Sequence, residues 1–151
     1  MHKKDKELNH DIGLFIIRLA IGSVFILHAF GKLGNLSGTV GFFERLDLAP
    51  AFAYIVLWVE MAGGLALIVG LFTKIAGVAL AVVMLSAIAF VRIRSGFIGG
   101  YEFEFVVMVV CLALAYTGSG RIALHRLGEL KRALNEDSGR HSWKDIIRSQ
   151  M

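Results

Sequence analysis

Four long apolar runs, separated by short polar segments, dominate the pattern of the chain. The runs cover residues 12–31, 51–71, 75–91 and 101–118. A helix rises about 1.5 Å per residue, so runs of about 17 to 21 residues reach roughly 26–32 Å, which is close to the thickness of a membrane's hydrocarbon core. Soluble helix bundles need polar outer faces, and these runs have almost no polar residues. The pattern therefore predicts an all-α fold in which four transmembrane helices pack as an antiparallel bundle.

Polar segments flank and connect the apolar runs. Residues 1–11 form a charged N-terminal segment, and residues 12–125 contain the predicted membrane domain. In the basic C-terminal tail, residues 126–151, leucines recur at helical spacing between arginine and lysine residues. This predicts an amphipathic helix that lies on the cytoplasmic surface or binds a partner. The loop 32–50 mixes apolar with polar residues, which predicts a short interfacial helix that begins after Thr39.

The composition agrees with a membrane protein. Apolar residues make up 56% of the 151 residues and charged residues 19%, whereas soluble domains contain about 45–50% and about 25%. The single cysteine excludes a disulfide framework, a cysteine-type zinc site and an iron–sulfur cluster held by this chain alone. The sequence has no aromatic-interleaved basic patch and no DNA-binding motif. Membrane lipids, and not nucleic acids, are therefore the expected partners.

Lysine and arginine residues are distributed unevenly between the two ends of the predicted spans. With four spans, both termini and the turn after the second span lie on one side of the membrane. That side holds eleven of the sixteen basic residues: Lys3, Lys4, Lys6, Lys74, Arg121, Arg126, Lys131, Arg132, Arg140, Lys144 and Arg148. The other side holds Lys32, Arg45, Arg92 and Arg94, while Arg18 lies within a span. The positive-inside rule therefore predicts that both termini are cytoplasmic.

Two charged residues, Arg18 and Glu60, lie within predicted spans. A charge inside the membrane costs a few kcal/mol and normally faces the bundle interior and a partner. Counted from the outer ends of their runs, the two residues differ in depth by about 6 Å, which an arginine side chain can bridge. We therefore expect an Arg18–Glu60 ion pair, which either belongs to a site or only orients the helices. Gly22, Gly63 and Gly64 are expected to let the helices approach closely.

A second group of polar residues gathers at the outer ends of the spans. His28 and Lys32 close the first span, and Tyr101 and Glu102 open the fourth. Lysine and histidine can donate hydrogen bonds to a carbonyl ligand, and histidine and carboxylates can carry protons. Residues two apart on a helix point about 200° apart, so only one of Glu102 and Glu104 can face the bundle. The sequence contains no closely spaced set of metal-ligating residues, so no metal site is predicted.

Several short motifs resemble those of the DoxX family of small bacterial membrane proteins. The first span carries Arg-x-x-x-Gly and His-x-x-Gly-Lys-Leu, the second carries Glu-x-x-Gly-Gly-x-x-Leu-x-x-Gly-Leu-x-Thr, and the fourth opens with Gly-Gly-Tyr-Glu. The motifs include Arg18, Gly22, His28, Lys32, Glu60, Gly63, Gly64, Tyr101 and Glu102. Arg92 and Glu104 depart from the family, where histidine and asparagine are common. The resemblance covers about residues 12–125.

The resemblance implies a four-helix protein of the bacterial cytoplasmic (inner) membrane. Some family members are described as subunits of quinone-linked oxidoreductases, which favours a redox-associated subunit with a quinone as its non-covalent ligand. The candidate ligand-binding residues are Arg18, His28, Lys32, Glu60, Tyr101 and Glu102. The chain has no redox centre of its own, so electrons would come from a redox partner subunit or a bound cofactor. Two alternatives stay open. The protein is a small-solute or proton transporter, which would need a homo-oligomer, or it is a scaffold subunit without activity.

Overall fold

The computed structural model describes residues 3–120, with side chains from Asn9 onward. Four of its helices are long and apolar enough to cross a membrane, which confirms the predicted all-α, four-span fold. They cover Asn9–Gly34, Ala51–Val69, Thr73–Ser95 and Phe97–Thr117. The amphipathic tail predicted for residues 126–151 lies outside the described residues.

The helices differ from the predicted runs mainly at their ends. In chain order they are α1 (Lys3–Gly34), α2 (Leu36–Glu44), α3 (Ala51–Val69), α4 (Thr73–Ala87) and α5 (Glu102–Thr117). The third span continues beyond α4 through a π-helical turn, η1 (Ile88–Arg92), and a 3-10 turn, η2 (Ile93–Ser95), and the turn η3 (Phe97–Tyr101) leads into α5. The first helix begins within the charged segment 1–11 and continues past residue 31, where its predicted span ends.

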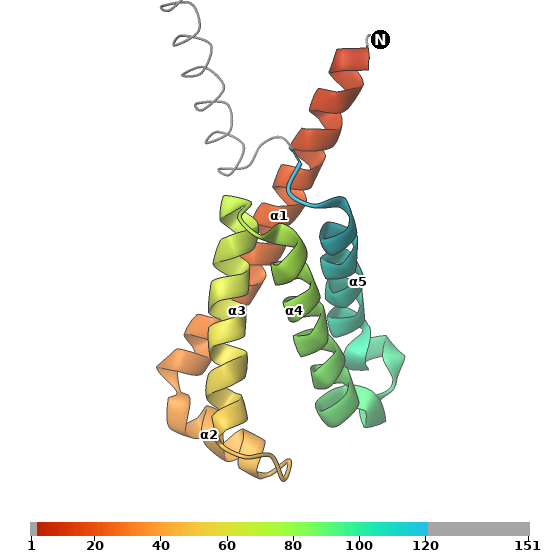
Figure 1. Ribbon diagram of the computed structural model, residues 1–151. Coiled ribbons are helices and arrows are strands. Elements are labelled where there is room, and N and C mark those ends of the chain that lie inside the picture. Colours follow the sequence, from red (N-terminus) through yellow and green to blue (C-terminus); the bar gives the residue numbers. More distant parts are fainter. Residues whose placement is uncertain (1–2, 121–151) are drawn as a thin grey trace, which may run out of the picture.

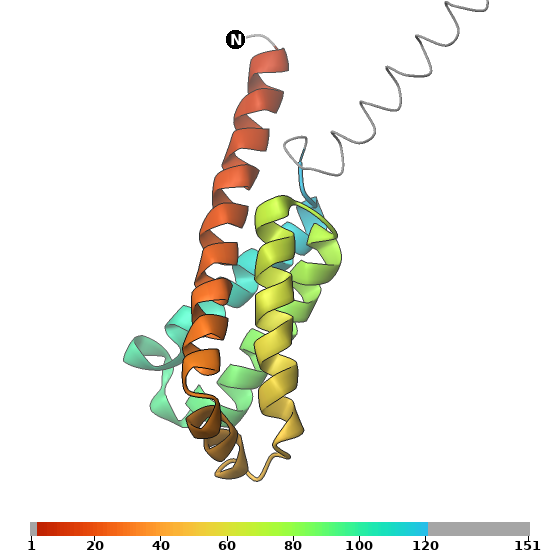
Figure 2. The ribbon, with the colours of Figure 1, turned by 90° about the vertical axis from the view of Figure 1, so that its left-hand side faces the viewer.

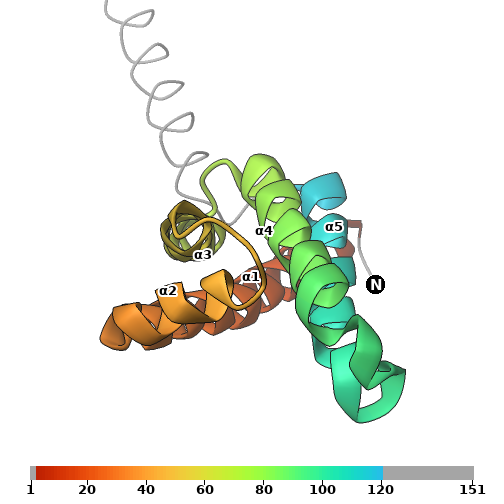
Figure 3. The same ribbon diagram turned by 90° about the horizontal axis from the view of Figure 1, so that it is seen from below.

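The bundle consists of two helix pairs. Helix α1 packs along α3, and α4 packs along α5, while the contact between α3 and α4 joins the pairs (Figure 1). The N-terminal end of α1 projects beyond the other helices (Figures 1 and 2). At the opposite end α3 and α4 diverge (Figure 1), and the view from that end shows the two pairs as separate arms (Figure 3). We label the two ends by the predicted orientation: the end with the α1 N-terminus is called the cytoplasmic end and the opposite end the outer end.

Glycines set the closest helix contacts. A Cβ atom built on Gly22 would lie 2.7 Å from the backbone oxygen of Gly64, and one built on Gly64 would lie 2.8 Å from the backbone oxygen of Gly22. These separations are too short for real Cβ contacts, so α1 and α3 can approach this closely only because both positions lack a side chain. Gly63 contacts the Leu80 side chain in the same way, which brings α4 close to α3.

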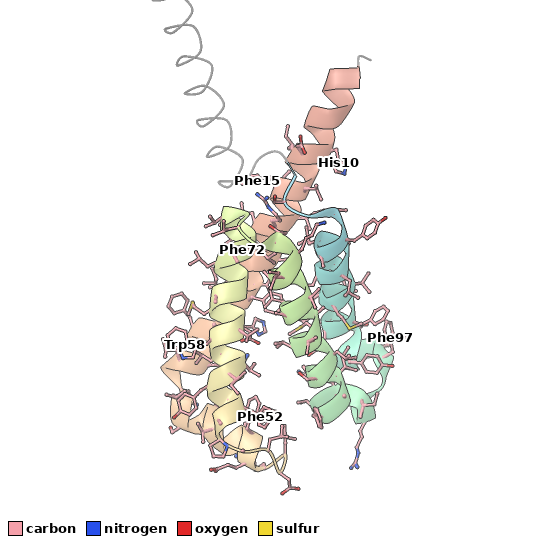
Figure 4. The ribbon with its side chains drawn as sticks, in the orientation of Figure 1. His10, Phe15, Phe52, Trp58, Phe72 and Phe97 are labelled. Carbon is pink, nitrogen blue, oxygen red and sulfur yellow. The ribbon has the colours of Figure 1, made fainter. Side chains whose placement is uncertain are left out.

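The outward faces of the helices carry large apolar side chains. Trp58 of α3 is 63% exposed, and it points away from the bundle, as does Phe97 at the far side (Figure 4). In water such faces would be costly, whereas lipid chains cover them without loss. The polar residues inside the bundle are therefore the unusual ones, and the candidate site is built from them.

The interfacial helix α2 begins earlier than predicted, at Leu36 and not after Thr39. Asn35 caps it, because its side-chain oxygen accepts a hydrogen bond from the backbone N–H of Gly38 at 3.1 Å. None of its residues is buried in the bundle, which fits a helix that rests on a membrane surface.

The orientation of the bundle can be tested with fusion reporters. Because the sequence assigns eleven basic residues to the side of the two termini and four to the other side, we expect both termini in the cytoplasm. A reporter that is active only in the cytoplasm should therefore be active when fused after Met151, and a reporter that is active only in the periplasm should be silent there. Activity of the periplasmic reporter alone would contradict the four-span orientation.

Candidate functional site

An ion pair between Lys32 of α1 and Glu60 of α3 is the buried polar centre of the outer half of the bundle. The Glu60 side chain is 2% exposed and that of Lys32 is 24% exposed. The carboxylate therefore lies inside the bundle, and the ammonium group connects it to the outer end. Glu60 shares the buried stripe of α3 with Leu57 and Gly64, so the helix itself directs the carboxylate inward.

The predicted Arg18–Glu60 ion pair is wrong, because the structure pairs Glu60 with Lys32. Helices α1 and α3 cross where Gly22 meets Gly64. Glu60 lies four residues from this crossing toward the outer end, and Arg18 lies four residues from it toward the cytoplasmic end. The two are therefore separated by about eight residues, or about 12 Å, along the bundle.

The predicted depths of Arg18 and Glu60 were wrong because they were counted from the outer ends of the two predicted helices. The sequence places Arg18 and Glu60 only about 6 Å apart if α1 ends at residue 31 and level with the start of α3. In the structure α1 continues to Gly34, and its register against α3 is set by the glycine crossing. Lys32, which the sequence assigns to the loop side of the first span, thereby becomes part of the helix and reaches Glu60.

Arg18 belongs to a separate polar cluster at the cytoplasmic end. It is 1% exposed, and its Nη1 donates a hydrogen bond to the backbone oxygen of Ser119, just beyond α5. The guanidinium carbon lies 5.8 Å from the ring centroid of Phe15 (Figure 4). Asp11 and Thr73 are also buried, at the level of the α1 N-terminal half and the start of α4. Arg18 thus fastens α1 to the end of α5 and does not reach the outer site.

His28 and Phe103 bridge the two helix pairs in the outer half. Their rings stack with centroids 6.2 Å apart and planes inclined by 13°. His28 lies one helical turn before Lys32 on α1, and Phe103 lies in the first turn of α5. The exposed imidazole of His28 therefore lies one turn from Lys32, and the Phe103 ring packs against that imidazole.

Of the two glutamates at the start of α5, Glu104 faces the bundle and Glu102 is exposed. The Oε1 atom of Glu104 lies 3.5 Å from Nε of Arg92, and its side chain is 15% exposed. Its Oε2 atom is buried and has no hydrogen-bond partner among the residues that the structure describes. Tyr101 is half-buried and packs edge-on against Phe97, with ring centroids 5.3 Å apart.

The inward position of Glu104 follows from its sequence spacing to the apolar residues of the same helix. Glu104 precedes Val107, Cys111 and Leu114, which are the buried residues of α5, by three, seven and ten positions. That is the spacing of one helix face, so the inward glutamate is the one aligned with the apolar stripe. The candidate residue Glu102 lies off this stripe.

The outer half thus combines a cation, a carboxylate, an imidazole and an aromatic ring. An ammonium group has three N–H donors, so Lys32 can bind Glu60 and still donate to a ligand oxygen. Glu60 and His28 can hold or pass on a proton. Of the six candidate ligand residues, the structure joins Lys32 and Glu60 directly. His28 lies one turn before Lys32, Tyr101 and Glu102 lie at the start of α5, and Arg18 lies apart from them at the other end of the bundle. In the described part of the chain, no three His, Cys, Asp or Glu side chains are grouped so that they could hold a metal ion.

Comparison with known proteins identifies similar membrane proteins. The sequence profile described as DoxX matches residues 13–93. The chain is 33% identical over 114 residues to the Bacillus subtilis (strain 168) protein named "Putative oxidoreductase CatD", covering 76% of this chain and 85% of that protein. It is 27% identical over 123 residues to the Escherichia coli (strain K12) protein named "Inner membrane protein YqjF", covering 78% of this chain and 92% of that protein. No solved structure shows significant similarity.

Proposed function

Because this chain belongs to the DoxX family, we propose that it is the membrane subunit of a quinone-linked oxidoreductase. It resides in the bacterial cytoplasmic (inner) membrane, in agreement with the name of its Escherichia coli relative. Its ligand is a quinone-type ring held in the outer half of the bundle, and a redox partner subunit supplies or removes the electrons. The name of the Bacillus subtilis relative supports a redox role.

The observation that carries this proposal is the buried Lys32–Glu60 ion pair. Replacing a buried ion pair by apolar residues of similar volume is often neutral or stabilising, so stability alone does not explain why a membrane bundle would contain one. Ionisable residues inside a membrane bundle characteristically mark pathways and ligand sites. Lys32 lies in the last turn of α1, at the end where the helix pairs diverge (Figure 1), and one helical turn after His28.

The side chains in the outer half fit a quinone-type ring. Lys32 donates a hydrogen bond to one ring oxygen while it stays bound to Glu60. Phe103 offers an aromatic edge or face against which a flat ring can pack. Glu60 and His28 hold the protons that such a ring exchanges. When bound, the quinone supplies two-electron, two-proton redox chemistry, which the chain's own side chains lack.

The proposal predicts that quinone co-purifies with the protein and depends on Lys32. The wild-type protein should retain quinone after gentle extraction into lipid nanodiscs, measured by mass spectrometry of an organic extract. Lys32→Met should lower the quinone content per folded protein at least tenfold, because a hydrogen bond from a charged group contributes about 1.5–3 kcal/mol.

Lys74→Met is the matched control, because Lys74 is an exposed lysine at the cytoplasmic end of the same bundle. It should leave the quinone content unchanged. Wild-type protein that contains no quinone, or equal content in the wild type and both variants, would refute the proposed site. A second measurement compares quinone affinity. Quinone is titrated into the wild type and into Lys32→Met, and binding is followed by tryptophan fluorescence.

A further inference from the structure

The polar residues buried in the bundle lie at two depths, with an apolar layer between them. Glu60 occupies the outer half, whereas Asp11, Arg18 and Thr73 lie toward the cytoplasmic end. These four are the buried polar or charged residues of the described chain. Any transfer of water or protons between the two levels must therefore cross the layer that separates them.

The layer is tightly packed. Phe25 is 1% exposed, and Leu67 and Leu80 are fully buried. On the α1 side, the backbones of Gly22 and Gly64 are so close that not even a Cβ atom would fit between the helices. Proteins packed to this density leave few voids large enough for water.

The layer also lacks groups that could hold water. All residues of α3 from Met61 to Val69 and of α4 from Ile75 to Leu85 are glycine or apolar. On α1, Ser23 is the polar residue between the two levels, and it is half-buried on the face next to the Gly22 contact. A buried water needs two to four polar partners, and one hydroxyl does not provide them.

The distance across the layer is too long for direct proton transfer. Glu60 and Arg18 are separated by about 12 Å along the bundle axis. A proton moves between heavy atoms about 2.6–3.2 Å apart, or through one bridging water. Several ordered waters would therefore be needed, and the layer offers no polar groups to position them.

Toward the outer end, Leu57 and Ala53 of α3 are buried as well, but a charged side chain crosses this region. Lys32 lies in the last turn of α1, is 24% exposed and reaches the Glu60 carboxylate, so an ammonium group that binds water leads from Glu60 to the outer end. We propose that Lys32 and Glu60 form a one-sided port that exchanges water, protons and ligand with the outer side of the membrane alone. A proton that Glu60 releases then enters the outer aqueous phase, and one that it takes up comes from there. The port does not depend on the ligand being a quinone.

Cysteine accessibility tests the port. In a Cys111→Ala background, which removes the single cysteine of the chain, Lys32→Cys, Glu60→Cys, Leu67→Cys and Lys74→Cys are made one at a time. Each is treated with a membrane-impermeant charged methanethiosulfonate in right-side-out and in inside-out membrane vesicles. Only hydrated thiols react quickly, because the thiolate is the reacting form.

We expect Lys32→Cys and Glu60→Cys to react at least tenfold faster in right-side-out vesicles. Lys74→Cys should show the reverse preference, and Leu67→Cys should react from neither side. Reaction of Glu60→Cys from the cytoplasmic side, or of Leu67→Cys at a rate similar to the exposed positions, would overturn the port. If Glu60→Cys does not accumulate, Leu57→Cys replaces it, because Leu57 lies about one turn outward on the same buried stripe and is 2% exposed. Quinone content is measured independently, so failure of the port and failure of the proposed ligand can be told apart.

Discussion

Replacing Lys32 by methionine is expected to destabilise the bundle by about 3–5 kcal/mol, the usual cost of leaving one member of a buried ion pair without its partner. The cost is large because Glu60, at 2% exposure, would keep a buried negative charge without its cation. Glu60→Gln should cost less, because the lysine that it leaves behind is 24% exposed and can extend its flexible stem to the outer interface. Thermal melts in detergent provide the measurement.

A double-mutant cycle shows whether the two residues act as a pair. Lys32→Met combined with Glu60→Met removes both charges, and the loss should be much smaller than the sum of the single losses. Lys74→Met, in an exposed lysine at the other end of the bundle, should leave the melting temperature unchanged. Additive losses in the double variant would show that Lys32 and Glu60 do not interact.

The second large effect is expected at the α1–α3 crossing. Gly64→Leu should cost at least about 3 kcal/mol, because overpacking by single methylenes already costs about 1–3 kcal/mol. Here even the Cβ atom would lie 2.8 Å from the backbone oxygen of Gly22. Relieving that contact requires α1 and α3 to move apart, which also draws Lys32 away from Glu60. Thermal melts and the yield of monodisperse protein measure the loss.

Two controls separate helix contact from helix propensity. Gly31→Ala lies on α1 with nothing within 4 Å of the added Cβ, so it should be neutral or stabilise by up to about 1 kcal/mol, whereas Gly64→Ala should destabilise. Leu65→Ala, at a side chain that is 55% exposed, should cost less than Gly64→Leu. Equal losses in Gly64→Ala and Gly31→Ala would contradict the crossing.

The spans could be predicted from the sequence because a single contribution, the transfer of apolar side chains into the hydrocarbon core, determines where they lie. A helix crosses the membrane when its apolar run matches the hydrocarbon thickness, and this depends on neighbouring residues along the chain alone. The interfacial helix was less well placed, because its start depends on the Asn35 cap and not on the apolar pattern. The ends of helices are set by such local hydrogen bonds, which hydropathy does not reveal.

The partner of Glu60 could not be predicted in the same way. It depends on the depth at which two helices cross, and an error of a few residues in this depth replaces one basic partner by another. The sequence indicates Arg18 as the partner of Glu60 and Lys32 only as a candidate ligand-binding residue, and the helix register set by the Gly22–Gly64 contact brings Lys32 to Glu60 instead. By contrast, the choice between Glu102 and Glu104 follows from the stripe of α5, and the sequence contained enough information to make it.

The most direct test of the outer site is the quinone content of the Lys32→Met/Glu60→Met double variant in nanodiscs, measured per folded protein beside the wild type. This variant retains no charge at the pair and should recover most of the stability, so a change in ligand content cannot be attributed to unfolding. If the pair binds the ligand, the double variant melts near the wild type and contains at least tenfold less quinone. A double variant that melts like the wild type and keeps the wild-type quinone content would contradict the site and leave the pair a purely structural role.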